Sequence, residues 1–366
     1  MWLTSSSVGR KFIMALTGAC LVLFVTFHCV MNAIAIVWPT AYNVICEFLG
    51  ANWYALVASM GLALLFIIHI IWATMLTLQN RRARGSVRYS VSKNAPGVEW
   101  SSKNMYVLGI VVLAFLVVHL INFWYKMQWA EIAGHEGFIP AQAGTLFIQE
   151  AFSTVWVPIV YIIGFVALWF HMNHGFWSMF QTCGWNNEIW IQRLKKAAAW
   201  WTSIVVCLFV AQAIVFTVHA SKDYYKTDDA LRNQYLAMVF DNYGMGANAQ
   251  DIQYADFARQ VEPMYQQISS MPAEQKAQVI AQQPQAKKQF EVIENLYRFV
   301  NYLEGKDPNA EPARPQIDPA VMQMMQQQAA QPEEGQPAPE EAQAQPEADQ
   351  PEADQPQAQP AENTND

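Results

Sequence analysis

Five long stretches without a charged side chain constrain this sequence more than any other feature. They comprise residues 12–38, 51–78, 105–125, 151–180 and 197–219. Each has the roughly 20 residues that an α-helix needs to cross about 30 Å of hydrocarbon. Helices and closed barrels alone satisfy their backbone hydrogen bonds within lipid. The sequence therefore predicts an all-α protein in which residues 1–220 form a bundle of five transmembrane helices.

Composition favours the same class of protein. Charged residues make up 14 % of the chain and aromatic residues 13 %, with 14 Trp and 16 Met, which is unusual for a soluble enzyme. The five cysteines are odd in number and form no Cys-X-X-Cys pair. This argues against a disulfide framework or a cysteine zinc site.

Basic residues in the connecting segments predict the orientation. The second connection and the fourth contain Arg81, Arg82, Arg84, Arg88, Lys93, Lys103, Arg193, Lys195 and Lys196. In the other two connections, residues 39–50 and 126–150, Lys126 is the single Lys or Arg. By the positive-inside rule the N-terminus lies in the cytoplasm, and after five crossings the C-terminus lies outside.

Two further regions follow the apolar part. Residues 221–306 are polar, with apolar side chains at helical spacing near their end, and predict a partly helical extension. Residues 307–366 contain thirteen Asp and Glu against the single Arg314, in a context rich in Pro, Gln and Ala. Such a segment buries too little apolar surface to fold, so it predicts a disordered acidic tail.

Four histidines stand one on each of the first four apolar runs. At 1.5 Å per residue, His28 and His119 lie about 21–24 Å from the cytoplasmic edge, whereas His69 and His171 lie about 14 Å from it. A polar ring in hydrocarbon needs a partner and is a functional candidate. The alternative is that each neutral ring only bridges two helices by hydrogen bonds.

Two histidines from different helices at one depth are what axial ligation of a haem iron requires. The four rings therefore predict two b-type haems, an outer one on His28 and His119 and an inner one on His69 and His171. Glycines give each macrocycle room where a helix passes it without ligating it. The ones that lie near the two predicted levels are Gly18 and Gly109 for the inner haem and Gly61 and Gly164 for the outer one.

These features together resemble a known family. Five helices with a ligand-like His on each of the first four, and the segment His171-Met-Asn-His174-Gly-Phe-Trp-Ser178-Met-Phe-Gln181-Thr182, are similar to the dihaem cytochrome b membrane anchor of bacterial succinate dehydrogenase and fumarate reductase. The resemblance covers residues 1 to about 220.

The resemblance implies a quinone-reactive subunit in the bacterial cytoplasmic membrane. It would pass electrons between menaquinone or menaquinol and a docked iron–sulfur subunit, with succinate–fumarate chemistry on a flavoprotein subunit on the cytoplasmic side. A dimer of such heterotrimers is a further expectation. The sequence has no dinucleotide-binding glycine fingerprint and no cysteine cluster of its own. No part of the argument calls for nucleic acid.

The resemblance and the chemistry of haem and quinone point to roles for other residues. Glu47 is a candidate proton acceptor for quinol oxidation or an ordinary loop acid. Arg81 and Arg82 are candidates for haem propionate or quinone contacts, or they serve only the topology or the acidic flank of a partner. His174, three residues after His171, either replaces it as a ligand or lies near a propionate, a quinone or another helix. Trp169 stands where some relatives have a carboxylate linked to proton transfer, which disfavours that route here.

Two other functions remain open at this point. One is the dihaem cytochrome b anchor of another respiratory enzyme, of the nitrate reductase or formate dehydrogenase type. The other is a transporter without haem. The sequence lacks the intramembrane carboxylates expected of a proton-coupled carrier.

Overall fold

The computed structural model describes residues 6–84, 100–134, 137–185, 187–246 and 252–312. These residues form helices and their connections, with no strand among them. The prediction for the acidic tail falls, from residue 313 onward, outside the described residues.

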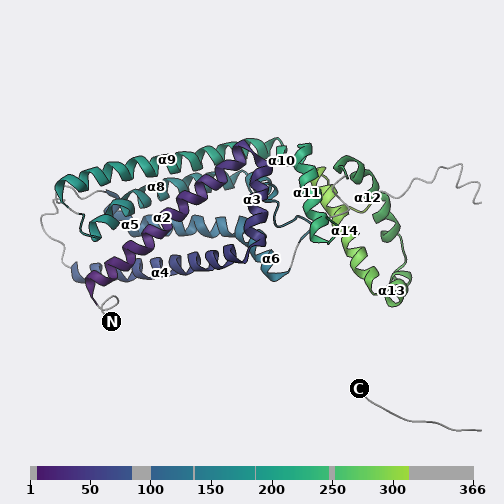
Figure 1. The fold of residues 1–366 in the computed structure, drawn as a ribbon, viewed down its shortest axis with the longest axis horizontal. Coiled ribbons are helices and arrows are strands. Elements are labelled where there is room, and N and C mark those ends of the chain that lie inside the picture. The colour runs from purple at the N-terminus through teal and green to yellow at the C-terminus, as the bar shows by residue number, and fades with distance from the viewer. Residues whose placement is uncertain (1–5, 85–99, 135–136, 186, 247–251, 313–366) are drawn as a thin grey trace, which may run out of the picture. The chain divides into compact units, whose positions relative to one another are not determined.

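Five spans long and apolar enough to cross a membrane confirm the predicted architecture. Four are single helices, namely α2 (Ser7–Val37), α4 (Trp53–Arg84), α8 (Trp156–Thr182) and α9 (Glu188–Ser221). The third span joins α5 (Trp100–His119), the π-helix η1 (Leu120–Trp129) and α6 (Ala130–Ala133). The chain is thus a multi-pass membrane protein (Figure 1).

Local sequence sets where several helices begin and end. The Ser6 hydroxyl accepts a hydrogen bond from the Gly9 amide at 2.9 Å and caps α2. At its other end α2 stops at Trp38, because the following Pro39 disfavours helical backbone before it and instead begins a new helix. The Asn187 side-chain oxygen accepts a hydrogen bond from the Trp190 amide at 2.8 Å and caps α9.

Exposed aromatic side chains gather near the ends of the spans. At the end where α2 finishes they include Trp38, Trp53, Tyr54, Trp124, Tyr125, Trp129 and Trp156, and at the opposite end they include Trp100, Trp185 and Trp190. Trp200 and Trp201 are also exposed, but further along α9. Trp and Tyr favour the boundary between hydrocarbon and water, so the two groups mark the two membrane interfaces. We call the end of the bundle where α2 finishes the extension end, and the opposite end, where α2 begins, the N-terminal end.

The spans differ in how far the protein buries them. Helix α2 packs against α4, α8 and α9, and α5 packs against α8. A third or more of the most apolar stretch of α8 and of α9 is buried, whereas none of that of α4 is. Helix α4 therefore has most of its surface available for lipid or for other partners.

The connections at the extension end are more helical than the sequence indicates. Residues 39–50 belong to α3 (Pro39–Ala51), which runs across the end of the bundle (Figure 1). Between residues 126 and 150, α6 is followed by α7 (Gly144–Phe152), in which every residue except Glu150 is buried. Both are short internal elements that hydropathy alone does not separate from loops.

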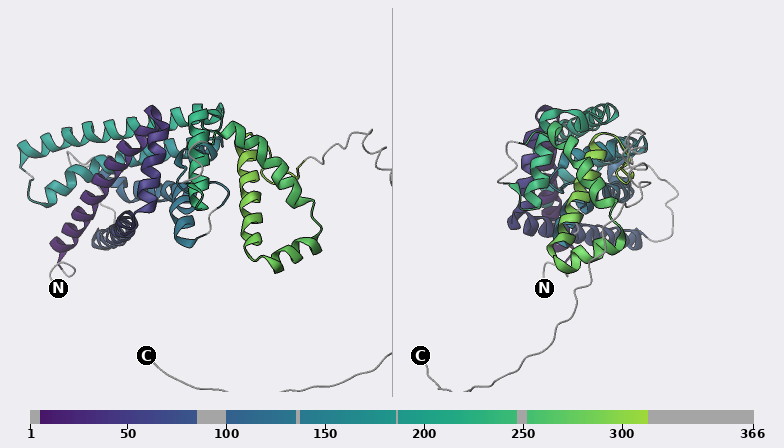
Figure 2. Two further views of the ribbon diagram at one scale, coloured as in Figure 1. Left: turned by 45° about the vertical axis from the view of Figure 1, so that its right-hand side comes forward. Right: turned by 90° about the vertical axis from the view of Figure 1, so that its right-hand side faces the viewer.

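In the part of the chain that the structure describes, five helices follow the last span. They are α10 (Tyr224–Thr227), α11 (Asp229–Asn242), α12 (Tyr254–Ser269), α13 (Ala273–Gln282) and α14 (Gln285–Leu303). Helices α12, α13 and α14 form a small unit in which α12 packs against α14 (Figure 2). Tyr265 stacks on Tyr297 there, with ring centroids 4.3 Å apart.

A buried polar network fastens this extension to the membrane part. The Asn43 carbonyl oxygen on α3 accepts hydrogen bonds from the amide and the hydroxyl of Thr145, at 3.0 and 2.9 Å. The Asn43 amide nitrogen donates to Gln234 on α11 at 3.0 Å. The Thr145 hydroxyl also lies 2.7 Å from the Tyr235 hydroxyl. Helices α3, α7 and α11 are therefore joined by hydrogen bonds as well as by apolar packing.

Candidate functional site

Two pairs of histidine rings face one another inside the helix bundle. His28 and His119 have ring centroids 5.7 Å apart with planes at 85°. His69 and His171 have centroids 6.3 Å apart with planes at 68°. The structure thus brings together the residues that helix depth pairs in the sequence, while their role as iron ligands stays a prediction.

Each pair joins two helices that are diagonal to one another. Helix α2 carries His28 and packs against α4 and α8, whereas α5, which carries His119, packs mainly against α8. His69 and His171 come from α4 and α8, the other diagonal. Helices α2, α4, α5 and α8 form one ring, and its two diagonals cross inside it, so both pairs of rings point inward.

The spacing of the rings fits a shared metal. An imidazole nitrogen lies about 2 Å from a bound transition metal, so two imidazoles on opposite sides of one metal have centroids about 6 Å apart. The separations of 5.7 and 6.3 Å lie on either side of that value. Direct packing of two rings also falls in this range, so spacing alone does not assign a metal.

Hydroxyl groups from neighbouring helices meet one ring of each pair. Thr17 Oγ1 on α2 lies 3.1 Å from His69 Nδ1. The Tyr161 hydroxyl on α8 lies 3.3 Å from His119 Nδ1, and Asn122 donates to the same hydroxyl at 3.4 Å. Both contacts leave Nε2 as the nitrogen available to a metal.

The other two rings have different surroundings. The Asn32 amide nitrogen lies 3.3 Å from both nitrogens of His28 and donates to the His28 carbonyl oxygen at 2.8 Å. The Tyr42 hydroxyl of α3 donates to the Asn32 carbonyl oxygen at 3.0 Å. His171 Nδ1 is buried and makes no hydrogen bond of standard geometry among the described residues.

Aromatic side chains enclose the outer pair. Phe24 and Phe209 lie beside His28, with centroid distances of 5.5 and 6.2 Å. Phe115 and Phe123 lie beside His119, at 6.0 and 5.3 Å. Apolar rings around a metal site restrict water and lower the local dielectric constant, which tunes a redox potential.

Two of the four predicted glycines, Gly109 and Gly164, lie at close approaches, and Gly18 is in ordinary van der Waals reach of a ring. A Cβ on Gly18 would lie 3.6 Å from His69 Cε1, and one on Gly109 would lie 3.3 Å from His171 Cε1. A Cβ on Gly164 would overlap the ring of Phe115, which packs on His119. Gly61 differs, because it is exposed and a Cβ there would meet no atom within 4 Å.

The structure also separates the roles of His171 and His174. The ring of His174 packs edge-to-face on Trp177, with centroids 4.7 Å apart. The ring that faces His69 is that of His171. His171 is therefore the better placed of the two as a ligand opposite His69.

The remaining predicted site residues lie at the ends of the bundle. Arg81 and Arg82 are exposed in the last turns of α4, at the N-terminal end and hence on the side of the inner pair. Glu47 is half-buried on α3 at the extension end. His219 at the end of α9 contacts the Tyr225 hydroxyl at 3.2 Å, and His135 lies outside the described residues.

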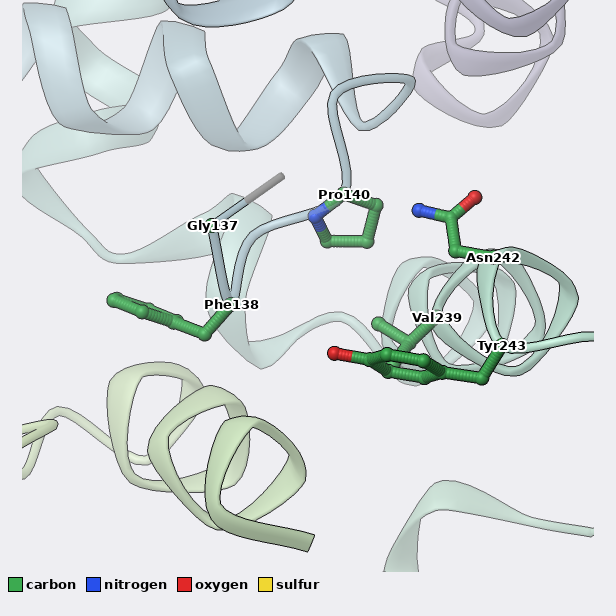
Figure 3. A pocket seen from close by; sticks show the side chains of 6 residues that line it. All are labelled: Gly137, Phe138, Pro140, Val239, Asn242 and Tyr243. Atoms are coloured by element: carbon green, nitrogen blue, oxygen red, sulfur yellow. The ribbon is translucent and has the colours of Figure 1, made fainter. Parts of the chain in front are cut away.

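Two hollows lie near the extension end. One, of about 10 Å³, is lined by Phe138, Pro140, Tyr243 and their neighbours and is at the limit for a single water (Figure 3). The other is an open apolar groove of about 900 Å³ between α2, α3 and α11. Val30, Ile34, Val44 and Gln234 are among the residues that line it.

Sequence reasoning missed Thr17, Asn32 and Tyr161. A signal was present, since a hydrogen-bonding side chain within an apolar span needs a partner. Among the described residues, no group of three or more His, Cys, Asp or Glu converges on a metal site. An axial pair supplies only two protein ligands, because the macrocycle supplies the others.

Comparison of the chain with family models, with curated proteins and with solved structures found no match.

Proposed function

We propose that this protein is the membrane-anchor electron-transfer subunit of a succinate dehydrogenase or fumarate reductase complex. The observation that supports this most is the pair of facing histidines on each diagonal of the bundle. The chain itself acts as the quinone-reactive subunit, and the succinate–fumarate chemistry belongs to a partner subunit.

The four histidines would hold two b-type haems, the outer one between His28 and His119 and the inner one between His69 and His171. A haem with two histidine ligands supplies one-electron transfer when bound, because both axial positions are filled. Thr17 and Tyr161 orient one ring of each pair. Gly18 and Gly109 leave room beside the inner rings.

The N-terminal end would face the cytoplasm and receive the iron–sulfur and flavoprotein subunits. Arg81, Arg82, Lys103, Arg193, Lys195 and Lys196 all belong to this end of the bundle. Basic residues next to spans favour the cytoplasmic side, here of a bacterial inner membrane. The inner histidine pair is then the one nearer to the docked partner, and the C-terminal tail lies outside.

The extension end would accept the quinone. The groove between α2, α3 and α11 is lined almost wholly by apolar side chains, which suits a lipid-soluble quinone of the menaquinone type. It includes Ile34, six residues beyond His28 on α2. Val44 also lines it, and Glu47 lies three residues further along α3, on the same face of that helix. Glu47 would accept one of the two protons released on quinol oxidation.

Spectroscopy of the purified membrane protein tests this function. We expect a sharp dithionite-reduced α-band and two haems per chain, together with co-purification of an iron–sulfur subunit and a covalent-flavin subunit. A colourless protein would contradict the proposal and leave the hydrogen-bonded histidines of a transporter. Two haems with partners of another respiratory enzyme would instead indicate an anchor of the nitrate reductase or formate dehydrogenase type.

A further inference from the structure

The hydrogen bonds around Thr17 determine which nitrogen of His69 carries the proton. Thr17 is buried, and its hydroxyl donates to the carbonyl oxygen of Ile13 on its own helix at 2.9 Å. Since a hydroxyl has one hydrogen, the oxygen can only accept from His69 Nδ1, which lies 3.1 Å away. His69 is therefore protonated on Nδ1, and its Nε2 lone pair is free for a metal.

Tyr161 occupies the equivalent position at the other pair. It is 4 % exposed, and its oxygen accepts a hydrogen bond from Asn122 at 3.4 Å. The oxygen lies 3.3 Å from His119 Nδ1 and has a second lone pair that can accept from it. The Tyr161 hydrogen has no other acceptor among the described residues, so the direction of this bond is an inference. The residues of η1 begin directly after His119, and this wider helix carries Asn122. π-Helical segments are frequent at functional sites.

Among the described residues, no hydroxyl contacts the second ring of either pair. His171 Nδ1 is buried and makes no hydrogen bond of standard geometry, and the ring interacts with the backbone of Met105. The side-chain atom near the His28 nitrogens is the amide nitrogen of Asn32, which is a donor and cannot accept an N–H. Each pair thus combines one ring held by a hydroxyl with one ring that is not.

We infer that Thr17 and Tyr161 are positioning residues, one for each histidine pair, which accept a hydrogen bond from Nδ1 of His69 and of His119 and so direct Nε2 of these rings to the metal. This inference rests on the proposed function. A hydrogen bond at Nδ1 fixes the ring orientation and raises the basicity of the ligand. The two hydroxyls therefore act on different sites, Thr17 on the inner haem and Tyr161 on the outer haem.

The test uses Thr17→Val and Tyr161→Phe in the full complex, because each removes a hydroxyl and nearly preserves shape. We expect each variant to raise the midpoint potential and to alter the low-spin resonance signal of one haem only, since a less basic ligand stabilises ferric iron less. Affinity for that haem should fall by about 10- to 100-fold. Thr17→Ser, which keeps the hydroxyl, should restore the inner signal.

Matched controls come from hydroxyls that do not contact histidine. Thr202→Val on α9 removes a buried hydroxyl that bonds only to its own helix, through Ala198 and Ala199. Tyr106→Phe removes a hydroxyl that contacts Thr74, 3.4 Å away on α4. Both should leave the two haem signals unchanged.

The outcomes separate this inference from the proposed function. If the wild-type complex holds two haems but Thr17→Val and Tyr161→Phe behave like the controls, the positioning role is wrong and the function stands. A change in both haems together in either variant also overturns the separate assignment. A wild-type protein without haem would contradict the proposed function, and the inference would fail with it.

Discussion

The ring of His28 on α2 faces the ring of His119 on α5, with 5.7 Å between their centroids, although these two helices lie on a diagonal of the bundle. A contact across a diagonal is made by the side chains and not by close packing of the backbones. The pair therefore depends on both residues being histidine. The role of the two facing rings can therefore be tested separately from the fold.

If the proposed function holds, replacing His119 by Ala should remove the outer haem and leave the inner one. The remaining ring, His28, cannot supply both axial ligands. The haem-to-protein ratio should fall from two to one, as measured by the pyridine haemochrome spectrum. His28→Ala should give the same spectrum, and His174→Ala, which removes a ring packed on Trp177, should keep both haems. Retention of two haems in His119→Ala would refute the pairing.

Replacing Gly109 by Val should disturb the inner haem. An added Cβ already lies 3.3 Å from His171 Cε1, so the methyl groups of Val would displace that ring. We expect loss of the inner haem signal with the outer one unchanged. Ala114→Val, at an exposed position of the same helix, adds similar bulk and should have no effect. Two intact signals in Gly109→Val would show that the ring tolerates the crowding.

Replacing Glu47 by Gln should slow quinol oxidation by roughly 100-fold without loss of haem, because the amide cannot accept the proton. Steady-state rates with a water-soluble menaquinol analogue measure this effect. Glu150→Gln is a suitable control, since Glu150 lies on α7 and pairs with Lys126 at 2.6 Å. An unchanged rate would make Glu47 an ordinary surface acid.

The spans and the depth of the histidines could be predicted from the sequence, because hydropathy and the rise of a helix are local properties. The partners of the ring nitrogens could not. Thr17 and His69 are 52 residues apart, and their contact depends on how α2 and α4 rotate about their own axes. Gly61 shows the same limit, since its level in the membrane does not tell which way it faces.

The burial of α3 and α7 could not be predicted for a different reason. Both segments are too short to span a membrane, so hydropathy classes them with the connecting loops. Their packing depends on the extension, since Asn43 and Thr145 are completed by Gln234 and Tyr235 about 90 to 190 residues further along the chain. Long-range contacts of this kind leave no periodic pattern in a single sequence.

Cys46 on α3 should resist alkylation while Cys183 reacts. Burial raises the pKa of the Cys46 thiol to about 12 from 9.0, and the thiolate is the reactive form. At pH 8 only about one Cys46 in 10⁴ is then ionised. N-ethylmaleimide followed by peptide mass spectrometry should label the exposed Cys183 in the folded protein and Cys46 only after unfolding. Equal labelling of both would contradict the buried environment of Cys46.

The same pKa shift makes stability depend on alkaline pH. Because the folded protein holds the Cys46 proton more tightly than the unfolded chain, this group favours unfolding once the unfolded thiol ionises. The free energy of unfolding should therefore decrease as pH rises from about 9 towards 12, and Cys46→Ser should reduce the slope. Thermal melts across this range measure it. An identical slope in the variant would show that Cys46 does not contribute.

Replacing Asn43 by Ala should loosen the extension from the membrane part. Its side chain is fully buried and bonds to Thr145 on α7 and to Gln234 on α11. Each buried partner left unsatisfied costs about 1–3 kcal/mol, so the extension should become sensitive to protease at temperatures at which the wild type resists. The control is Asn104→Ala, because Asn104 bonds only to Trp100 on its own helix. If both variants are cleaved at the wild-type rate, apolar packing alone fixes the extension.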